Sequence, residues 1–174
     1  SPRHSAVCVT AGLRQMLSRQ ELEGVIAHEL SHVKHRDVLI STIAAVVAGA
    51  ITMLTYFGLF FGGGDDDEGN PLVALALMIL APIAAGLIRM AISRSREFEA
   101  DRAGAHIAGS PRGLANALRK LHEGSRRVPL PVPESQSSLF IVQPLTGKRG
   151  GMKKLFMTHP PVEERLARLN AMNV

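Results

Sequence analysis

The sequence predicts a mainly α-helical protein with a small α+β part, into which a transmembrane helical hairpin is inserted. Two long runs without a charged residue, 38–61 and 71–88, predict the hairpin. Apolar residues at helical spacing before and after these runs predict that most of the remaining chain is helical. Short apolar stretches at 5–10 and 139–142 predict the few strands.

Length and composition fit one ordinary domain with a core built mainly from aliphatic side chains. The chain has 174 residues, of which 46% are hydrophobic and only 4% are aromatic. That is enough apolar material to bury a core. The formal net charge of +5 would suit nucleic acid, but aromatic residues do not interleave with basic ones as a base-stacking surface requires. We therefore expect no nucleic-acid partner.

The first ten residues, SPRHSAVCVT, contain the single cysteine of the chain. They have neither an initiator methionine nor the basic and apolar blocks of a signal peptide, so we expect the chain to be a piece of a longer protein. A lone Cys8 excludes an intrachain disulfide and zinc sites built from CxxC pairs. We expect Cys8 to be a small buried residue in the strand at 5–10.

Helices are predicted on both sides of the apolar runs. One helix begins after Ser18 and carries residues 21–37, and it can continue without a break into the first apolar run. A second helix follows the other apolar run, from about 93 to 108, and ends at the sequence GSP.

The C-terminal third continues this pattern of helices and loops. Ser110 and Pro111 are a good N-cap and first helical residue for a helix that ends near Gly124. Residues 126–138 are rich in Pro and Ser, which indicates a loop, and the sequence TGKRGGMKK at 146–154 is expected to be flexible and basic. A last helix begins near HPPVEER and has an apolar face formed by Val162, Leu166, Leu169 and Met172.

Both apolar runs are long enough to cross a membrane. The 24 uncharged residues of 38–61 would form a helix of about 36 Å, against roughly 30 Å for a hydrocarbon core. Pro82 in the second run is tolerable because a membrane helix can satisfy the freed carbonyl group locally. The alternative is a buried hairpin in a soluble core, but the remaining sequence could hardly cover two helices that are apolar on every face.

The charges beside the two runs predict their orientation. Lys34 and Arg36 precede the first run and Arg94 and Arg96 follow the second, whereas residues 65–68 between the runs are all acidic. The positive-inside rule then places both outer ends in the cytoplasm. The predicted organisation is two parts of one core, 1–37 and 93–174, separated by a span at 38–61, an acidic loop at 62–70 and a second span at 71–92.

The stretch VIAHELSHVKHRD, residues 25–37, has the HExxH pattern of a catalytic metal site. Residues four apart are neighbours on a helix, so His28 and His32 can both present an imidazole nitrogen to one metal ion. Glu29 is rotated by about 100° from His28 and can reach a water molecule without being a ligand. The alternative is a chance match on a helix, and the motif alone does not exclude it.

A third ligand must come from elsewhere in the chain. His35 is unsuitable because three ligands on consecutive turns of one straight helix cannot surround a single ion. Glu97 and Asp101, in SRSREFEADRAGA, share one helical face. One carboxylate can bind a metal while the other accepts a hydrogen bond from a ligand imidazole. The alternative is a surface ladder of ion pairs with the nearby arginines.

The motifs VIAHELSHVKHRD, SREFEADRAGA and FMTHPPVEERLARL occur in an order that resembles the HtpX family of integral-membrane zinc metalloproteases. The resemblance implies a zincin-like metalloprotease core in which one Zn²⁺ is bound by His28, His32 and Glu97. It also implies that Glu29 is the general base and acid and that Asp101 supports a ligand imidazole. His159 and Arg165 would stabilise the oxyanion, for which positively charged and hydrogen-bonding groups are suited. The alternative to this role is a structural one, in which this segment only begins a helix and Arg165 forms an ion pair on the surface.

The resemblance further implies a multi-pass protein of the cell inner membrane, with the protease part facing the cytoplasm. Its substrates would be polypeptides, and its role would be the quality control of misfolded or damaged membrane proteins. The alternative is a non-catalytic membrane scaffold or sensor that keeps zinc for structure. Such sites usually have four protein ligands, whereas the sequence offers three and an intact Glu29. The residues do not indicate an oligomeric state or the role of residues 126–150.

Overall fold

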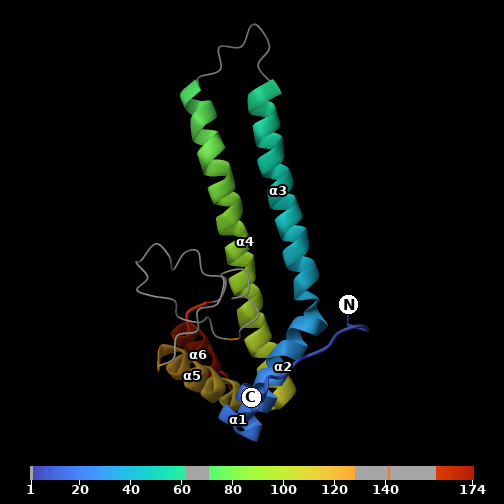
Figure 1. The fold of residues 1–174 in the computed structure, drawn as a ribbon, viewed down its shortest axis with the longest axis vertical. Helices are drawn as coiled ribbons and strands as arrows, with labels where there is room; N and C mark the ends of the chain where they lie inside the picture. Colours follow the sequence, from blue (N-terminus) through green and yellow to red (C-terminus); the bar gives the residue numbers. More distant parts are fainter. Residues whose placement is uncertain (1, 62–70, 128–140, 142–159) are drawn as a thin grey trace. The chain divides into compact units, whose positions relative to one another are not determined.

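The computed structural model describes residues 2–61, 71–127, 141 and 160–174. Its helices are α1 (Ala11–Met16), α2 (Arg19–His35), α3 (Asp37–Phe61), α4 (Pro71–Ala108), α5 (Arg112–Arg127) and α6 (Val162–Asn170) (Figure 1). The described residues form two compact units, one from Ser1–Asp37 and Arg94–Val174 and the other from Val38–Ser93. The prediction of a mainly helical chain is confirmed.

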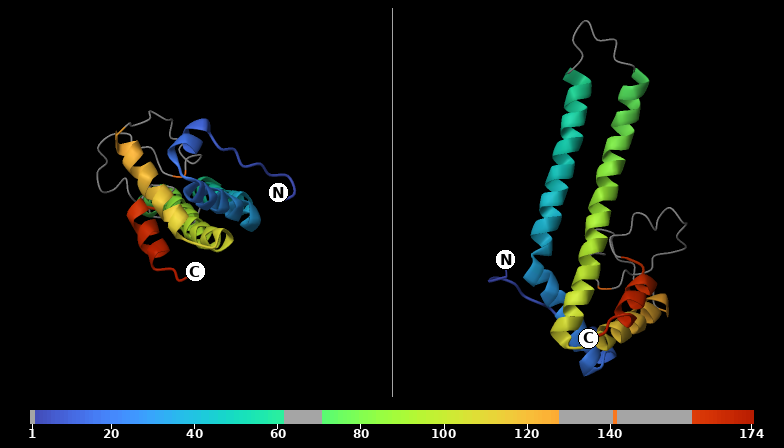
Figure 2. Two further views of the ribbon diagram at one scale, coloured as in Figure 1. Left: turned by 90° about the horizontal axis from the view of Figure 1, so that it is seen from below. Right: turned by 180° about the vertical axis from the view of Figure 1, so that it is seen from behind.

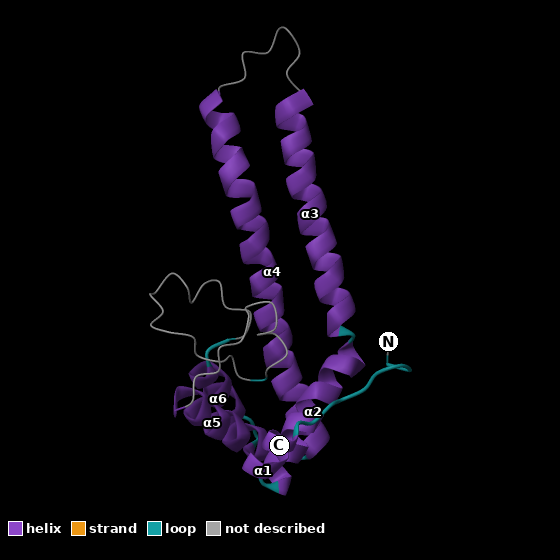
Figure 3. Ribbon diagram, in the orientation of Figure 1, coloured by secondary structure: helices purple, strands orange, loops and turns teal. Residues whose placement is uncertain are grey.

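The predicted strand at 5–10 is wrong, because these residues are not hydrogen-bonded as a strand and the described part of the chain has no strand (Figure 3). An apolar stretch becomes a strand only when a neighbouring strand satisfies its backbone groups. Cys8, expected to be buried there, is exposed. Of the other predicted strand, 139–142, only Ile141 is among the described residues.

In the unit Val38–Ser93, the apolar stretches of α3 and α4 run alongside each other (Figures 1 and 2). The Tyr56 hydroxyl donates a hydrogen bond to the Met78 carbonyl at 3.3 Å. Both helices are long and apolar enough to cross a membrane, and almost none of their apolar stretch is buried inside the protein. That exposure argues against the alternative of a hairpin buried in a soluble core.

The boundaries of these long helices differ from the prediction. The helix that begins after Ser18 does not continue into the first apolar run, because Arg36 adopts a left-handed conformation (φ 56°) that ends α2 before α3 begins. In contrast, α4 continues without interruption through Pro82 and past residue 93, where a new helix was expected. Neither glycine nor proline lies between Gly86 and Gly104 to interrupt it.

The other unit is organised around α5, which packs on α2 and on α6 (Figure 2). α5 begins at Arg112, one residue later than predicted, and the Ser110 hydroxyl accepts a hydrogen bond from the Arg112 backbone N–H. The helix ends at Arg127 rather than near Gly124. Leu169 of α6 is buried, and Val162, Leu166 and Met172 pack against the same core, as predicted. The buried residues of this apolar cluster are Leu17, Val25, Ala105, Leu114, Ala115, Ala117, Leu118 and Leu169.

A capping box fixes the start of α2. The Ser18 side chain accepts a hydrogen bond from the Glu21 backbone N–H, and the Ser18 N–H donates to the Glu21 carboxylate at 2.7 Å. Lys120 of α5 donates to the same carboxylate at 2.7 Å. Burial opposes ionisation of Glu21, but Lys120 and Ser18 together lower the pKa of Glu21 below its usual value. This cluster therefore holds α2 and α5 together at the end of α2 away from the histidines.

Candidate metal centre

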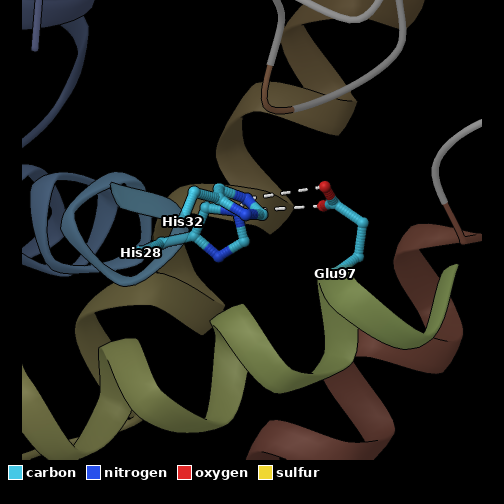
Figure 4. Close-up of side chains that lie close together, drawn as sticks. All are labelled: His28, His32 and Glu97. Carbon is cyan, nitrogen blue, oxygen red and sulfur yellow. Dashed lines mark hydrogen bonds and ion pairs between the residues drawn. The ribbon is translucent and has the colours of Figure 1, made fainter. Parts of the chain in front are cut away.

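Three of the predicted site residues converge on one point. His28 and His32 extend from α2 and Glu97 extends from α4, and Figure 4 shows their side chains pointing toward one another. The two imidazole Nε2 atoms are 3.1 Å apart. Glu97 Oε1 is 3.5 Å from His32 Nε2, and Glu97 Oε2 is 3.8 Å from His28 Nε2. His28 and Glu97 are buried, with 1% and 7% of their surfaces exposed, and His32 is half-buried.

A close approach of two helices brings these residues together. Glu97, Asp101 and Gly104 lie at i, i+4 and i+7 on α4 and therefore share one face. At Gly104 that face touches the backbone of α2, because a Cβ atom there would lie 2.9 Å from both Cα and N of His28. Gly104 thus permits the contact that sets His28 opposite the carboxylates of α4.

Each histidine has a carboxylate at its other ring nitrogen. His28 Nδ1 is 3.0 Å from Asp101 Oδ1, and His32 Nδ1 is 2.6 Å from Asp37 Oδ2. A carboxylate accepts hydrogen bonds, so these contacts favour the tautomers that carry the proton on Nδ1. The Nε2 lone pairs of the two rings then face each other and Glu97.

This arrangement fits a divalent metal ion. Two nitrogen lone pairs and a carboxylate that face one another repel unless a cation lies between them. Ligand atoms of a tetrahedral zinc site with bonds near 2.0–2.1 Å are about 3.4 Å apart, close to the separations of 3.1, 3.5 and 3.8 Å measured here. Two imidazoles and one carboxylate are also a donor set that zinc accepts.

Arg165 of α6 lies behind this cluster and is 1% exposed, so the alternative of a surface pair is wrong. Its guanidinium donates to both oxygens of Asp101, from Nε at 2.8 Å and from Nη2 at 2.6 Å. Nη1 donates to the Ile141 carbonyl at 3.0 Å and is 3.5 Å from Glu97 Oε2. Arg165 therefore touches the two α4 carboxylates that face the histidines.

Charge pairing outweighs burial for both partners of this ion pair, which lie outside the predicted spans 38–61 and 71–92. Burial by itself would lower the pKa of Arg165, but Asp101 and then Glu97 raise it. Burial by itself would raise the pKa of Asp101, but the hydrogen bonds and charges of Arg165 and then His28 lower it. Both groups are therefore charged at neutral pH.

The other predicted residues lie as follows. Glu29 is half-buried on α2, directly after His28, and is near enough to Arg165 to raise the pKa of that guanidinium further. His159 lies outside the described residues. His35 donates from Nδ1 to the Ser31 carbonyl at 3.0 Å and does not join the three converging ligands.

Sequence reasoning missed Asp37 and Arg96. Asp37 lies five residues after His32, beyond the left-handed residue Arg36, so no regular helical spacing places it beside that imidazole. Arg96 donates from Nε to Asp37 Oδ1 at 2.7 Å, and its Nη2 contacts the same oxygen. The only signal in the sequence was a carboxylate just after the motif and an arginine just before Glu97.

The chain is similar to known peptidases. The chain matches the model for peptidase family M48 over residues 2–173. It is 57% identical to a protease HtpX homolog of Syntrophotalea carbinolica, covering 100% of this chain and 64% of that protein. It is 56% identical to a protease HtpX homolog of Salinibacter ruber, covering 99% of this chain and 61% of that protein.

A protease HtpX homolog of Pelotomaculum thermopropionicum is 54% identical, with 100% of this chain and 64% of that protein covered. The chain thus spans 61–64% of the length of these three relatives. No solved structure matches it. The family match over nearly every residue, together with the converging His28, His32 and Glu97, establishes that the chain belongs to peptidase family M48.

Proposed function

We propose that the protein is a membrane-bound, zinc-dependent endopeptidase. The observation that carries this proposal is the convergence of His28, His32 and Glu97 beside Glu29 of the HExxH motif. His28, His32 and Glu97 would hold one Zn²⁺ through Nε2, Nε2 and a carboxylate oxygen. When bound, zinc would supply a Lewis acid that polarises water and the scissile carbonyl. Family M48 is zinc-dependent, which agrees with this donor set.

The number of ligands favours catalysis over a structural role for zinc. Structural zinc sites usually have four protein ligands, whereas catalytic sites have three and an open position. Among the described residues, three acidic or histidine side chains converge, and Asp37 and Asp101 contact the Nδ1 atoms instead. This supports an endopeptidase rather than a zinc-containing scaffold or sensor.

The protein groups would divide the proton transfers and the positioning between them. Glu29 would take a proton from the attacking water and deliver it to the leaving amine. Asp101 and Arg165 would orient His28 and Glu97 through the contacts described above. The stabilisation of the oxyanion by His159 and Arg165 stays a prediction.

The proposed substrates and location follow from the resemblance and from the two apolar helices. Both α3 and α4 are long and apolar enough to span a membrane, which supports a multi-pass protein of the inner membrane. The basic residues at the outer ends of the apolar runs support a protease part that faces the cytoplasm. Resemblance to the HtpX family supports polypeptide substrates, in particular misfolded or damaged membrane proteins.

Metal removal tests this proposal directly. Casein is offered to the purified protein in detergent, before and after treatment with 1,10-phenanthroline, and the release of peptides is measured. We expect chelation to stop hydrolysis and one equivalent of zinc to restore it, because the ion completes the site. Magnesium is the control and should restore nothing, since it prefers oxygen ligands in octahedral geometry. Undiminished hydrolysis by the metal-free protein would contradict the proposal.

Replacing Glu97 with alanine should reduce the zinc content of the purified protein to well below one equivalent. Only the imidazoles of His28 and His32 then remain as ligands, and the negative charge of the Glu97 carboxylate, which offsets the charge of the zinc ion, is lost. Metal analysis of the dialysed protein measures the effect. Glu99→Ala is the matched control, because Glu99 is a half-buried carboxylate on the same helix that does not join the cluster. Stoichiometric zinc in Glu97→Ala would eliminate Glu97 as a ligand.

A further inference from the structure

The first residue of α3, Asp37, is built into the metal centre. Asp37 as a residue is 7% exposed, and its Oδ2 is 2.6 Å from His32 Nδ1. Asp37 is in this place because Arg36 turns the chain through a left-handed conformation (φ 56°, ψ 42°) directly after α2. A continuous helix would have rotated residue 37 away from the face that carries His32.

The second oxygen of this carboxylate is held from the neighbouring helix. Arg96 of α4 contacts Asp37 Oδ1 through both Nε and Nη2, with the Nε contact at 2.7 Å. Arg96 directly precedes Glu97, so the same turn of α4 supplies a converging carboxylate and the cation that fixes Asp37. With Oδ1 held by Arg96, Oδ2 faces the imidazole.

The same arrangement occurs at the other histidine. Asp101 contacts His28 Nδ1, and Arg165 holds Asp101 from behind. Each of the two histidines therefore has a carboxylate at Nδ1 and an arginine behind that carboxylate. The two arrangements share their chemistry but not their place in the fold. Asp101 and Arg165 connect α2 and α4 to α6, whereas Asp37 and Arg96 connect α2, α3 and α4.

We propose that Asp37 is a positioning residue for His32, held in place by Arg96, and that the affinity of the site for zinc depends on this pair. The inference rests on the proposed zinc site. By accepting the Nδ1 proton, Asp37 keeps the Nε2 lone pair of His32 available, fixes the ring direction and makes the imidazole a stronger donor. Loss of such a partner typically weakens metal binding by about 10- to 100-fold.

A merely structural role for Asp37 is the competing explanation. An acidic residue in the first turn of α3 is favourable for that helix, and its ion pair with Arg96 joins the start of α3 to α4. Such a role would change the stability of the protein when Asp37 is replaced. It would leave the affinity of the folded protein for zinc unchanged.

The test measures zinc affinity by competition with a chromogenic chelator, in detergent and in a Glu29→Gln background so that self-cleavage does not interfere. Thermal unfolding of the metal-free protein is measured in parallel. We expect Asp37→Ala to weaken zinc binding by about 10- to 100-fold. Asp37→Asn should bind zinc with an affinity between those of Asp37→Ala and the parent, because its amide oxygen still accepts the His32 proton. Like Asp37→Ala, it should be less thermally stable than the parent, because both variants lose the ion pair with Arg96.

Glu21→Gln is the matched control, because Glu21 is another buried, ion-paired carboxylate that lies in the capping box away from the histidines. It should lower thermal stability without changing zinc affinity. Zinc affinity of folded Asp37→Ala within twofold of the parent would overturn the inference. If Asp37→Ala does not fold, Arg96→Gln replaces it, and an unchanged zinc affinity there overturns the inference equally. Failure of both the Glu29→Gln parent and the unsubstituted protein to bind zinc would instead overturn the proposed function, and the inference with it.

Discussion

Glu29→Gln is expected to reduce peptide hydrolysis by about 10²- to 10⁴-fold, the usual contribution of a positioned general base. The amide has nearly the same size as the carboxylate but cannot take a proton from water. Zinc content should stay near one equivalent, because Glu29 is not among the three converging ligands. Initial rates of casein hydrolysis and metal analysis of the same preparation measure both effects.

Glu23→Gln provides the matched control for this result. Glu23 is an exposed carboxylate on the same helix, and its described contact is an ion pair with Arg19 at 2.9 Å. We expect its hydrolysis rate to equal that of the unsubstituted protein. Unchanged turnover by Glu29→Gln would remove Glu29 from the proposed mechanism. Loss of zinc from that variant would show that Glu29 supports the metal and would leave the identity of the base open.

Local helical spacing and the resemblance to a known family together predicted the converging residues. His28 and His32 are four apart on one helix, and Glu97 shares a helical face with Asp101. These relations depend only on the regular geometry of α2 and α4. Glu97 lies 65 positions after His32, and it could be paired with the histidines because the resemblance identified both motifs and each motif lies on a helix.

Features that depend on a single irregular residue or on tertiary packing could not be predicted. One left-handed residue, Arg36, places Asp37 beside His32, and no periodic pattern contains that information. Cys8 and the stretch 5–10 were misassigned because an apolar run specifies a strand only when a partner strand is available. The Arg165 in EERLARL resembles a surface arginine until α6 packs against the carboxylates of α4.

Replacing Arg165 with leucine is expected to destabilise the metal-free protein by about 3–5 kcal/mol, the usual effect of removing one partner of a buried ion pair. Asp101, 3% exposed, would be left without its bidentate partner. For a chain of this size, one kcal/mol changes the midpoint of unfolding by about 2–4 °C, so we expect a decrease of about 10 °C. Thermal unfolding in detergent measures it.

Arg168→Leu is the matched control on the same helix. Arg168 pairs with Glu164 at 3.1 Å and lies 3.6 Å from the centroid of the Phe98 ring, but its side chain is 58% exposed. An exposed pair and a cation–π contact each contribute about 1 kcal/mol or less, so this variant should lose far less stability than Arg165→Leu. Equal losses in both variants would show that the buried pair does not hold α6 against α4.

A double variant, together with measurements of zinc affinity and turnover, distinguishes two roles for Arg165. If Arg165 acts by holding Asp101, the double variant Asp101→Asn/Arg165→Leu should be more stable than the sum of the single effects predicts, because no buried charge is left without a partner. Its zinc affinity should still be reduced, because Asn is a weaker partner for His28 than Asp. If Arg165 stabilises the oxyanion instead, Arg165→Leu should bind zinc normally and lose turnover alone. The buried contacts with Asp101 and Glu97 favour the first outcome.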